Sequence, residues 1–151
     1  MVYVSARTDY AVRAMLAITG DRPRWVKAAS LAAAQEIPLS FLHGILLDLR
    51  RAGLLHSHRG GDGGYSLARP ATEISVGDVL RAVSGAVTTV RGLPADLASY
   101  HGVAAGLGDV WIAVQNAIEG VVDRTTLAEL AAAGSAIVSG AAPTLTQGEI
   151  A

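Results

Sequence analysis

The sequence predicts a mainly α-helical fold with one small β-hairpin and a long helix near its carboxyl end. Apolar residues recur at helical spacing over most of the chain, which favours helices. Between residues 54 and 68 the pattern changes to two short strand-like runs around a glycine cluster, which is typical of a hairpin. Hydrophobic residues make up 51% of the 151 residues and aromatic residues only 5%, so the core must be mainly aliphatic.

The first two expected helices cover roughly residues 5–19 and 28–35. In the first, four apolar residues share one face and predict a buried stripe: Ala11, Ala14, Met15 and Ile18. A Gly-Asp-Arg-Pro run at 20–23 ends this helix. In the second, Leu31 and Ala32 are expected to face inward, and the helix stops before Pro38 because proline disfavours helical geometry in the preceding residue.

The third expected helix has Ser40 as its N-cap and runs to about Ala52. Its buried face is the clearest in the chain, because four apolar residues recur at i, i+3, i+4 and i+7: Leu42, Ile45, Leu46 and Leu49. Gly53 follows where a left-handed C-terminal cap is expected.

A hairpin is expected next, with strands at 54–59 and 65–68 joined by a flexible Gly-Gly-Asp-Gly-Gly tip. Ser75 is expected to cap a fourth helix over 76–84. The buried side of this helix would carry Val79, Leu80 and Val83.

The carboxyl half predicts a loop, a long amphipathic helix and a short helix. The loop, 85–108, contains five glycines, and the long helix from Asp109 to about Asp123 has Trp111 beside one apolar row. That row consists of Val110, Val114, Ile118 and Val121. A short helix, 126–133, and a flexible tail, 134–151, complete an expected organisation of 1–84, 85–108, 109–133 and 134–151.

Charge is distributed unevenly along the chain. Residues 1–69 hold nine Lys and Arg against five Asp and Glu, about +4, whereas the remainder holds three against eight, about −5. A basic front half suits contact with a polyanion. Chance asymmetry on a solvated surface is the alternative explanation.

Cysteine is absent, which excludes disulfides, thiolate nucleophiles, zinc fingers and all-cysteine iron–sulfur ligation. We see no signal peptide and no apolar run long enough for a bilayer, so we expect a cytoplasmic protein without membrane contact. The glycine cluster lacks the Lys-Ser or Lys-Thr of a nucleotide-binding loop, and no catalytic constellation is apparent, so no enzyme activity is expected.

Two short helices, a tight turn and a following hairpin are the element order of a winged helix-turn-helix, whose second helix enters the DNA major groove. With its Leu and Ile side buried, the third helix would turn Ser40, Phe41, His43, Gly44, Leu47, Asp48, Arg50 and Arg51 outward. His43 can bond base edges, and Gly44 permits close approach. Arg50 and Arg51 are expected to hold phosphates, while Arg59 and Gly60 lie on the wing.

Each of these residues has a simpler interpretation. Arg50 and Arg51 would also be favoured as solvated charges at a helix C-terminus, His43 as a surface polar residue, and Phe41 as part of the core. His56 and His58 share one face of a strand, but no third ligand lies near them in sequence, so no metal site is expected.

The chain resembles the Rrf2 family of bacterial winged-helix regulators, the group of IscR, NsrR and CymR. The resemblance covers residues 1–130 and rests on matching runs at 9–15, 31–32, 37–42, 49–54, 59–60 with 63–65, 74–79 and 125–130. It implies a homodimer formed through a long helix, here 109–124, and binding to an inverted-repeat DNA operator. By family match, Ser40, Phe41, His43, Arg50 and Arg59 fall on DNA-contacting positions.

The chain also differs from the cluster-binding members of this family. Cluster-binding members carry three cysteines between the fourth helix and the long helix, whereas residues 87–108 have none. Asp9 matches an acidic cluster ligand of one member, but alone it is expected only to cap a helix or form a salt bridge. No cofactor is therefore expected.

The main hypothesis is a cluster-free repressor that binds double-stranded DNA and responds to a small molecule or protein effector. Candidate effector residues are Leu93, Tyr100, His101 and Trp111, with core packing as the alternative for Trp111. The competing hypothesis is a partner-binding module that keeps this fold without binding DNA. The apolar residues Phe41 and Leu47, which are expected to face outward, support this hypothesis.

Overall fold

The computed structural model describes residues 4–20, 25–138 and 140 and contains the expected elements in the expected order. The amino-terminal part consists of α1 (Ala6–Gly20), α2 (Ala28–Gln35), α3 (Leu39–Arg51), β1 (Leu55–His58) and β2 (Gly64–Leu67). A short 3-10 turn, η1 (Ala71–Glu73), leads to α4 (Val76–Ser84). The long helix is α5 (Leu107–Val122), and α6 (Leu127–Val138) follows it.

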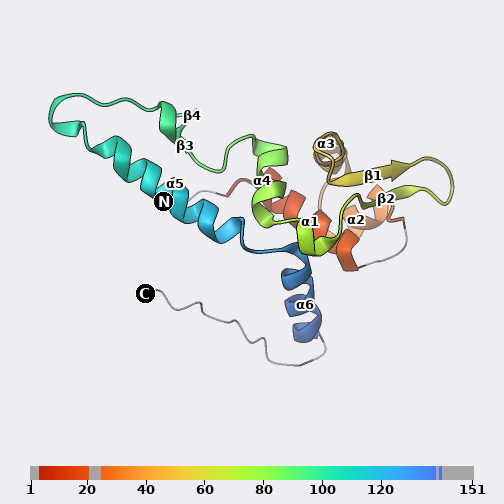
Figure 1. Cartoon of the computed structure of the whole chain (residues 1–151). Helices are drawn as coiled ribbons and strands as arrows, with labels where there is room; N and C mark the ends of the chain where they lie inside the picture. Colours follow the sequence, from red (N-terminus) through yellow and green to blue (C-terminus); the bar gives the residue numbers. More distant parts are fainter. Residues whose placement is uncertain (1–3, 21–24, 139, 141–151) are drawn as a thin grey trace.

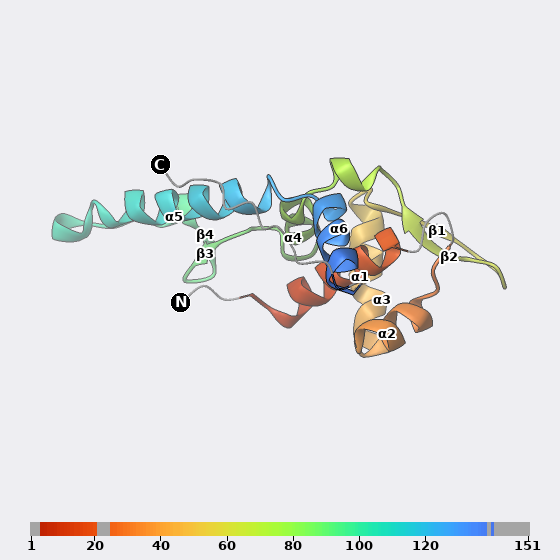
Figure 2. The same ribbon diagram turned by 90° about the horizontal axis from the view of Figure 1, so that it is seen from below.

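The molecule is a helical body with projections at opposite ends. The β1–β2 hairpin extends from one end, and α5 extends from the other as an arm (Figures 1 and 2). Helix α6 returns to the body, where it packs against α1 and η1 (Figure 2). The carboxyl-terminal helix is therefore part of the same packed unit as α1.

The core is aliphatic, as the composition requires. The predicted inward residues of α3 are fully buried: Leu42, Ile45, Leu46 and Leu49. The predicted stripe of α1 is buried with them, and Val79 of α4 and Leu127 of α6 join the same cluster. Leu80 and Val83, also expected inward, are only half-buried. Burial of α3 on one side leaves its opposite face to solvent.

The turn between α2 and α3 depends on Glu36, which has a φ of 53° and closes α2 in the left-handed conformation. Helix α3 then begins at Leu39, so the prediction of Ser40 as its N-cap is wrong. Pro38 occupies the cap position instead. Its fixed φ of −56° suits the entry to a helix, and its carbonyl accepts the N–H groups of Phe41 and Leu42, both at 3.0 Å. Gly53 has a φ of 77°, as expected for the residue that follows this helix.

The hairpin, referred to below as the wing, pairs Leu55 with Leu67 and His58 with Gly64. A third segment that the sequence did not predict supports it, because Val26 exchanges two backbone hydrogen bonds with Tyr65, at 2.8 and 2.9 Å. Gly64 lies at this crossing with a φ of 147°, and a Cβ placed there would be 2.5 Å from the carbonyl oxygen of Val26. This glycine allows close backbone approach at the base of the wing.

Replacing Gly64 with alanine should therefore destabilise the wing. The added methyl group meets backbone rather than a movable side chain, and the left-handed φ adds strain. We expect a loss of about 1–3 kcal/mol in the free energy of unfolding, measured by chemical denaturation. Gly61→Ala is the matched control, since a Cβ at Gly61 meets nothing within 4 Å. Equal losses in both variants would contradict this explanation.

Ser75 caps α4 as predicted. Its Oγ accepts the N–H of Asp78, and the Asp78 carboxylate accepts the N–H of Ser75, each at 3.0 Å. The following segment is not the plain loop that was expected. It contains a small hairpin, β3 (Thr89–Val90) and β4 (Leu93–Pro94), and two 3-10 turns, η2 (Ala95–Leu97) and η3 (Gly102–Ala104).

This small hairpin turns at Arg91 and Gly92, both with positive φ, which is the geometry that tight two-residue hairpins favour. Helix α5 begins at Leu107, slightly earlier than expected. Helix α6 continues to Val138, so the expected end near Ala133 and the start of a flexible tail at Gly134 are wrong. Residues 141–151 of the expected tail lie outside the described residues.

Within the described ranges, each helix taken alone is too short or too polar to cross a membrane. Helices α2 and α3 reach the necessary length and apolar content only as a pair, and they are bent by 118° relative to one another.

Candidate nucleic-acid interface

The outward face of α3 carries the side chains that the sequence predicts to contact DNA. Ser40, His43, Gly44, Arg50 and Arg51 are exposed, on the side opposite the four buried leucine and isoleucine residues. A helix of this kind can enter the major groove with its polar side chains toward the base edges. The structure therefore brings the predicted DNA-contacting residues of α3 onto one accessible surface.

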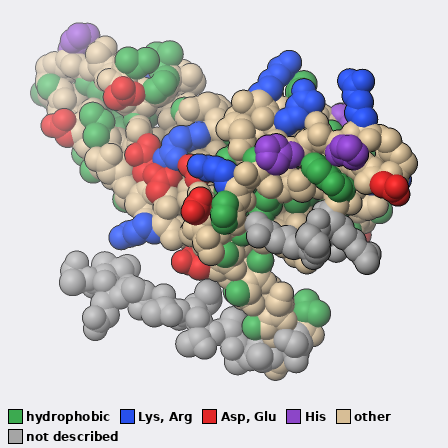
Figure 3. Space-filling view, turned by 45° about the vertical axis from the view of Figure 1, so that its right-hand side comes forward, with side chains coloured by type: hydrophobic (Ala, Val, Ile, Leu, Met, Phe, Trp, Pro, Cys, Tyr) green, Lys and Arg blue, Asp and Glu red, His purple; other side chains and the backbone are tan. Residues whose placement is uncertain are grey.

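The wing extends this surface. Arg59 and Gly60 are exposed directly after β1. Arg50 at the end of α3 donates from Nη1 to Ser57 Oγ of β1 at 3.1 Å, so one guanidinium lies between the helix and the wing. In Figure 3, Lys and Arg side chains project from the part of the molecule that holds α3 and the wing. This concentration of positive charge is suited to phosphate groups.

An aromatic and cationic cluster supports the amino-terminal end of α3. The ring of Phe41 meets the ring of Tyr10 edge to face at 5.7 Å, and the guanidinium of Arg13 lies 4.9 Å from the Tyr10 ring centre. Arg13 also donates to the carbonyl of Gln35 at 2.8 Å and pairs with Asp9 at 3.0 Å. Phe41 remains 44% exposed, so its ring is held in place without entering the core.

Asp48, an acidic residue on the outward face, is paired with Arg7 of α1. Arg7 also donates from Nε to the carbonyl of Val83 in α4 at 3.3 Å, and its Nη1 lies 3.7 Å from the position a Cβ on Gly44 would take. Sequence reasoning missed this contact, since Arg7 and Asp48 are 41 positions apart and no local pattern joins them. The pair offsets the carboxylate of α3 that would otherwise oppose a phosphate at this face.

His56 and His58 lie exposed on β1, and the imidazole of His58 stacks on the indole of Trp25 at 5.3 Å. In the part of the chain that the structure describes, no group of three or more His, Cys, Asp or Glu side chains could hold a metal ion. Asp9, considered above for its match to a cluster ligand, forms its salt bridge with Arg13.

The candidate effector residues lie in the 85–108 segment and at the start of α5. Leu93 and His101 are exposed, while Tyr100 is half-buried with Arg91 over its ring at 5.6 Å. Trp111 is half-buried, and its indole nitrogen has no hydrogen-bond partner among the described residues. Two surface hollows, of about 460 and 340 Å³, are lined by residues from other parts of the chain.

The donor chemistry does not fit an iron–sulfur cluster. Such clusters need thiolate ligands, and the sequence contains no cysteine. The segment between α4 and α5 offers only Asp96 and His101 as strong metal ligands.

Residues 4–133 match the family model Rrf2, described as an iron-dependent transcriptional regulator. The candidate HTH-type transcriptional regulator Rv1287 of Mycobacterium tuberculosis is 46% identical over 129 residues, which cover 85% of this chain and 80% of that protein. The regulator CymR of Bacillus subtilis is 29% identical over 131 residues, covering 85% and 88% of the two chains.

Solved structures agree with these matches. The structure of B. subtilis CymR, described as a global cysteine regulator, superposes with a TM-score of 0.74 at 27% identity and covers 87% of this chain and 98% of its own. T. potens IscR superposes with a TM-score of 0.71 at 30% identity, covering 97% and 94%. With the fold, the exposed α3 face and the wing in agreement, the chain belongs to the Rrf2 family of transcriptional regulators.

Proposed function

We propose that this protein binds an inverted-repeat DNA operator as a homodimer and represses transcription in response to a signal other than an iron–sulfur cluster. The exposed polar face of α3, which lies beside a wing that carries Arg59, is the single observation that supports DNA binding most strongly. Ser40, Phe41 and His43 would meet bases, and Arg50, Arg51 and Arg59 would hold phosphates.

The dimer is supported by the surface of α5. Its apolar row is incompletely covered in the single chain, with Val110 51% exposed, Val114 41% and Val121 61%. A second copy of α5 would remove this surface from water, which is the main driving force for association. A two-fold dimer also matches two half-sites of opposite orientation.

The proposed effector region is the 85–108 segment together with the start of α5, around Leu93, Tyr100, His101 and Trp111. Helix α5 packs against η2 in this segment. An effector bound there would act next to the helix that joins the two copies.

Binding to duplex DNA from the region upstream of the protein's own gene tests the proposal, measured by fluorescence anisotropy over a series of salt concentrations. We expect Arg50→Ala and Arg59→Ala to weaken binding and to lower the slope of log K against log salt by about 0.9 for each phosphate that is no longer neutralised. Arg91→Ala removes an exposed arginine between β3 and β4, remote from α3, and should change neither quantity.

Absence of binding at any salt concentration would contradict the proposal. It would favour a partner-binding module instead, because Leu39, Phe41 and Leu47 are exposed apolar residues on α3. Expression of a reporter from the same upstream region tests repression separately, and deletion of the regulator should raise it.

A further inference from the structure

The junction from which α5 leaves the helical body is formed by two helix starts that are fixed to each other. Ser75 and Thr126 form an antiparallel bridge, in which the N–H of Val76 donates to the carbonyl of Thr125 and the N–H of Leu127 donates to the carbonyl of Ile74, both at 2.9 Å. The beginnings of α4 and α6 are therefore bonded directly to each other, and the short link 123–125 connects α5 to them.

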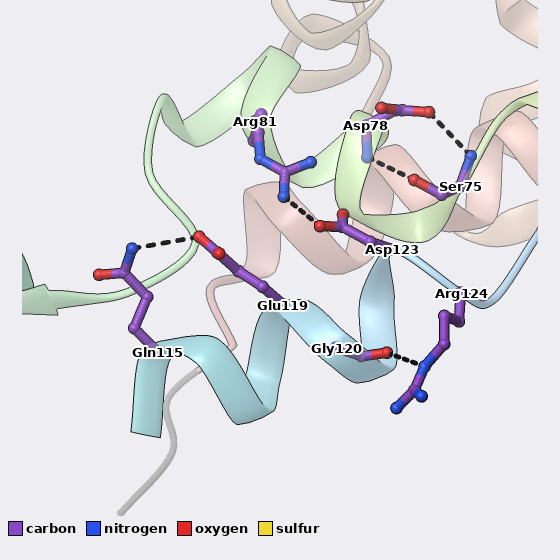
Figure 4. Close-up of polar contacts among 8 residues, drawn as sticks. All are labelled: Ser75, Asp78, Arg81, Gln115, Glu119, Gly120, Asp123 and Arg124. Atoms are coloured by element: carbon purple, nitrogen blue, oxygen red, sulfur yellow. Dashed lines mark hydrogen bonds and ion pairs between the residues drawn. The ribbon is translucent and has the colours of Figure 1, made fainter. Parts of the chain in front are cut away.

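An ion pair joins the end of α5 to the last turn of α4. Arg81 of α4 donates from Nη2 to Oδ2 of Asp123 at 2.7 Å, and Asp123 is the C-cap of α5, with its own N–H bonded to the carbonyl of Glu119 (Figure 4). Figure 4 shows the two side chains meeting between α4 and the last turn of α5. Helix α5 contacts α4 of the helical body, and it packs against η2 in the 85–108 segment.

Gly77 in the first turn of α4 makes room for this contact. A Cβ built at Gly77 would overlap the Oδ1 atom of Asp123, so the carboxylate rests directly on the glycine backbone. The position is also favourable for a negative charge, because the first turn of a helix carries the positive end of its dipole. Any larger residue at position 77 would have to displace Asp123.

Further charges surround the pair. The hydrogen bond to Asp123 raises the pKa of the Arg81 guanidinium above its ordinary value, and the nearby carboxylates of Glu119 and Asp78 act in the same direction. Asp78 in turn pairs with Arg69, which follows the wing, at 3.6 Å. The ionic contacts thus extend from the end of the wing, through α4, to the end of α5.

We propose that Arg81, Asp123 and Gly77 are positioning residues that fix the angle between α5 and the DNA-contacting body, and thereby set the half-site spacing that the dimer accepts. This inference rests on the proposed function. Helix α5 has 16 residues, about 24 Å, so a tilt of about 10° moves its far end by about 4 Å. That displacement exceeds the rise of one base pair, about 3.4 Å.

The angle can be measured without DNA by distances between two spin labels. Because the chain has no cysteine, Ala33→Cys on α2 and Asn116→Cys on α5 give two unique labelling sites, both exposed. Diluting the labelled chain into unlabelled protein isolates the distance within one copy. We expect one narrow distance distribution for the otherwise unchanged chain, and a broad or shifted one after Arg81→Gln or Gly77→Ala.

Arg124→Gln is the matched control, since Arg124 is exposed and its hydrogen bond among the described residues goes to the carbonyl of Gly120 in α5, at 2.5 Å. The distribution of spin-label distances in Arg124→Gln should remain narrow. Narrow and unshifted distributions in both Arg81→Gln and Gly77→Ala would overturn the inference. Circular dichroism and thermal melting confirm that each variant is folded, and Arg81→Gln should pass this check because an exposed ion pair contributes little stability.

Binding to a series of inverted repeats with different spacings gives the functional readout. Arg81→Gln should lower the preference for the best spacing by up to about fivefold, the scale of an exposed ion pair, while binding to a single half-site stays unchanged. An equal loss on the half-site, or an unchanged spacing preference, would contradict the inference. If the unsubstituted protein binds neither probe, the proposed function itself fails, whereas the spin-label result still stands.

Discussion

Replacing Val114 with aspartate should prevent dimerisation and weaken binding to an inverted repeat by about 10²–10⁴-fold, because two linked contacts become one. Val114 lies in the apolar row of α5 and is partly exposed in the single chain, so a charge there costs the folded monomer little. In the dimer, the same carboxylate would be buried beside its symmetry copy, which is strongly unfavourable. Sedimentation velocity gives the oligomeric state, and anisotropy gives the affinity.

Asn116→Asp adds the same charge to the same helix and serves as the control. Asn116 is exposed and lies two residues from Val114, about 200° around the helix, away from the apolar row. This variant should remain dimeric and bind as tightly as the unsubstituted protein. If both Val114→Asp and Asn116→Asp remain dimeric, the apolar row of α5 is not the interface.

Truncating Leu46 to alanine should have the largest effect on stability. Leu46 is completely buried where α3 packs against the body, and removal of a buried leucine side chain costs about 2–5 kcal/mol. A small domain has roughly 5–15 kcal/mol in total, so a sizeable fraction of its stability would be lost. Urea denaturation followed by circular dichroism measures the change.

Leu47→Ala removes the same atoms from the next residue along α3. Leu47 is 36% exposed on the outward face, so its truncation should cost less than that of Leu46, about 1 kcal/mol in the free energy of unfolding. Comparable losses in the two variants would mean that α3 is oriented differently from this structure. A loss of DNA binding in Leu47→Ala without a loss of stability would place Leu47 in the interface.

The sequence was sufficient to predict the parts of the fold that depend on local pattern. Leu42, Ile45, Leu46 and Leu49 identified the buried side of α3, because their spacing leaves only one face that can enter a core. The same pattern placed His43 and Arg50 outside. Ser75 was correctly predicted as a cap, and the structure adds Asp78, three residues later, as its reciprocal partner.

Contacts between segments that are distant in the chain could not be predicted from the sequence. The pairing of Arg7 with Asp48, of Val26 with Tyr65, and of Arg81 with Asp123 each depends on how complete elements pack together. Helix α6 was predicted too short because the residues from Gly134 onward are small, polar or flexible, and glycine itself lowers helix propensity by about 1 kcal/mol relative to alanine. The neighbouring alanines and the packing of α6 on α1 outweigh that cost.

We propose that the outward face of α3 contacts bases in DNA. Selection of preferred sites from a random duplex library, performed with the unsubstituted protein and with His43→Ala, tests it most directly. We expect an inverted repeat for the unsubstituted protein, and relaxed preference at one symmetric base position for His43→Ala, with a discrimination loss of about 1–3 kcal/mol there. Identical preferences from the two proteins, or no selected sequence at all, would contradict the account.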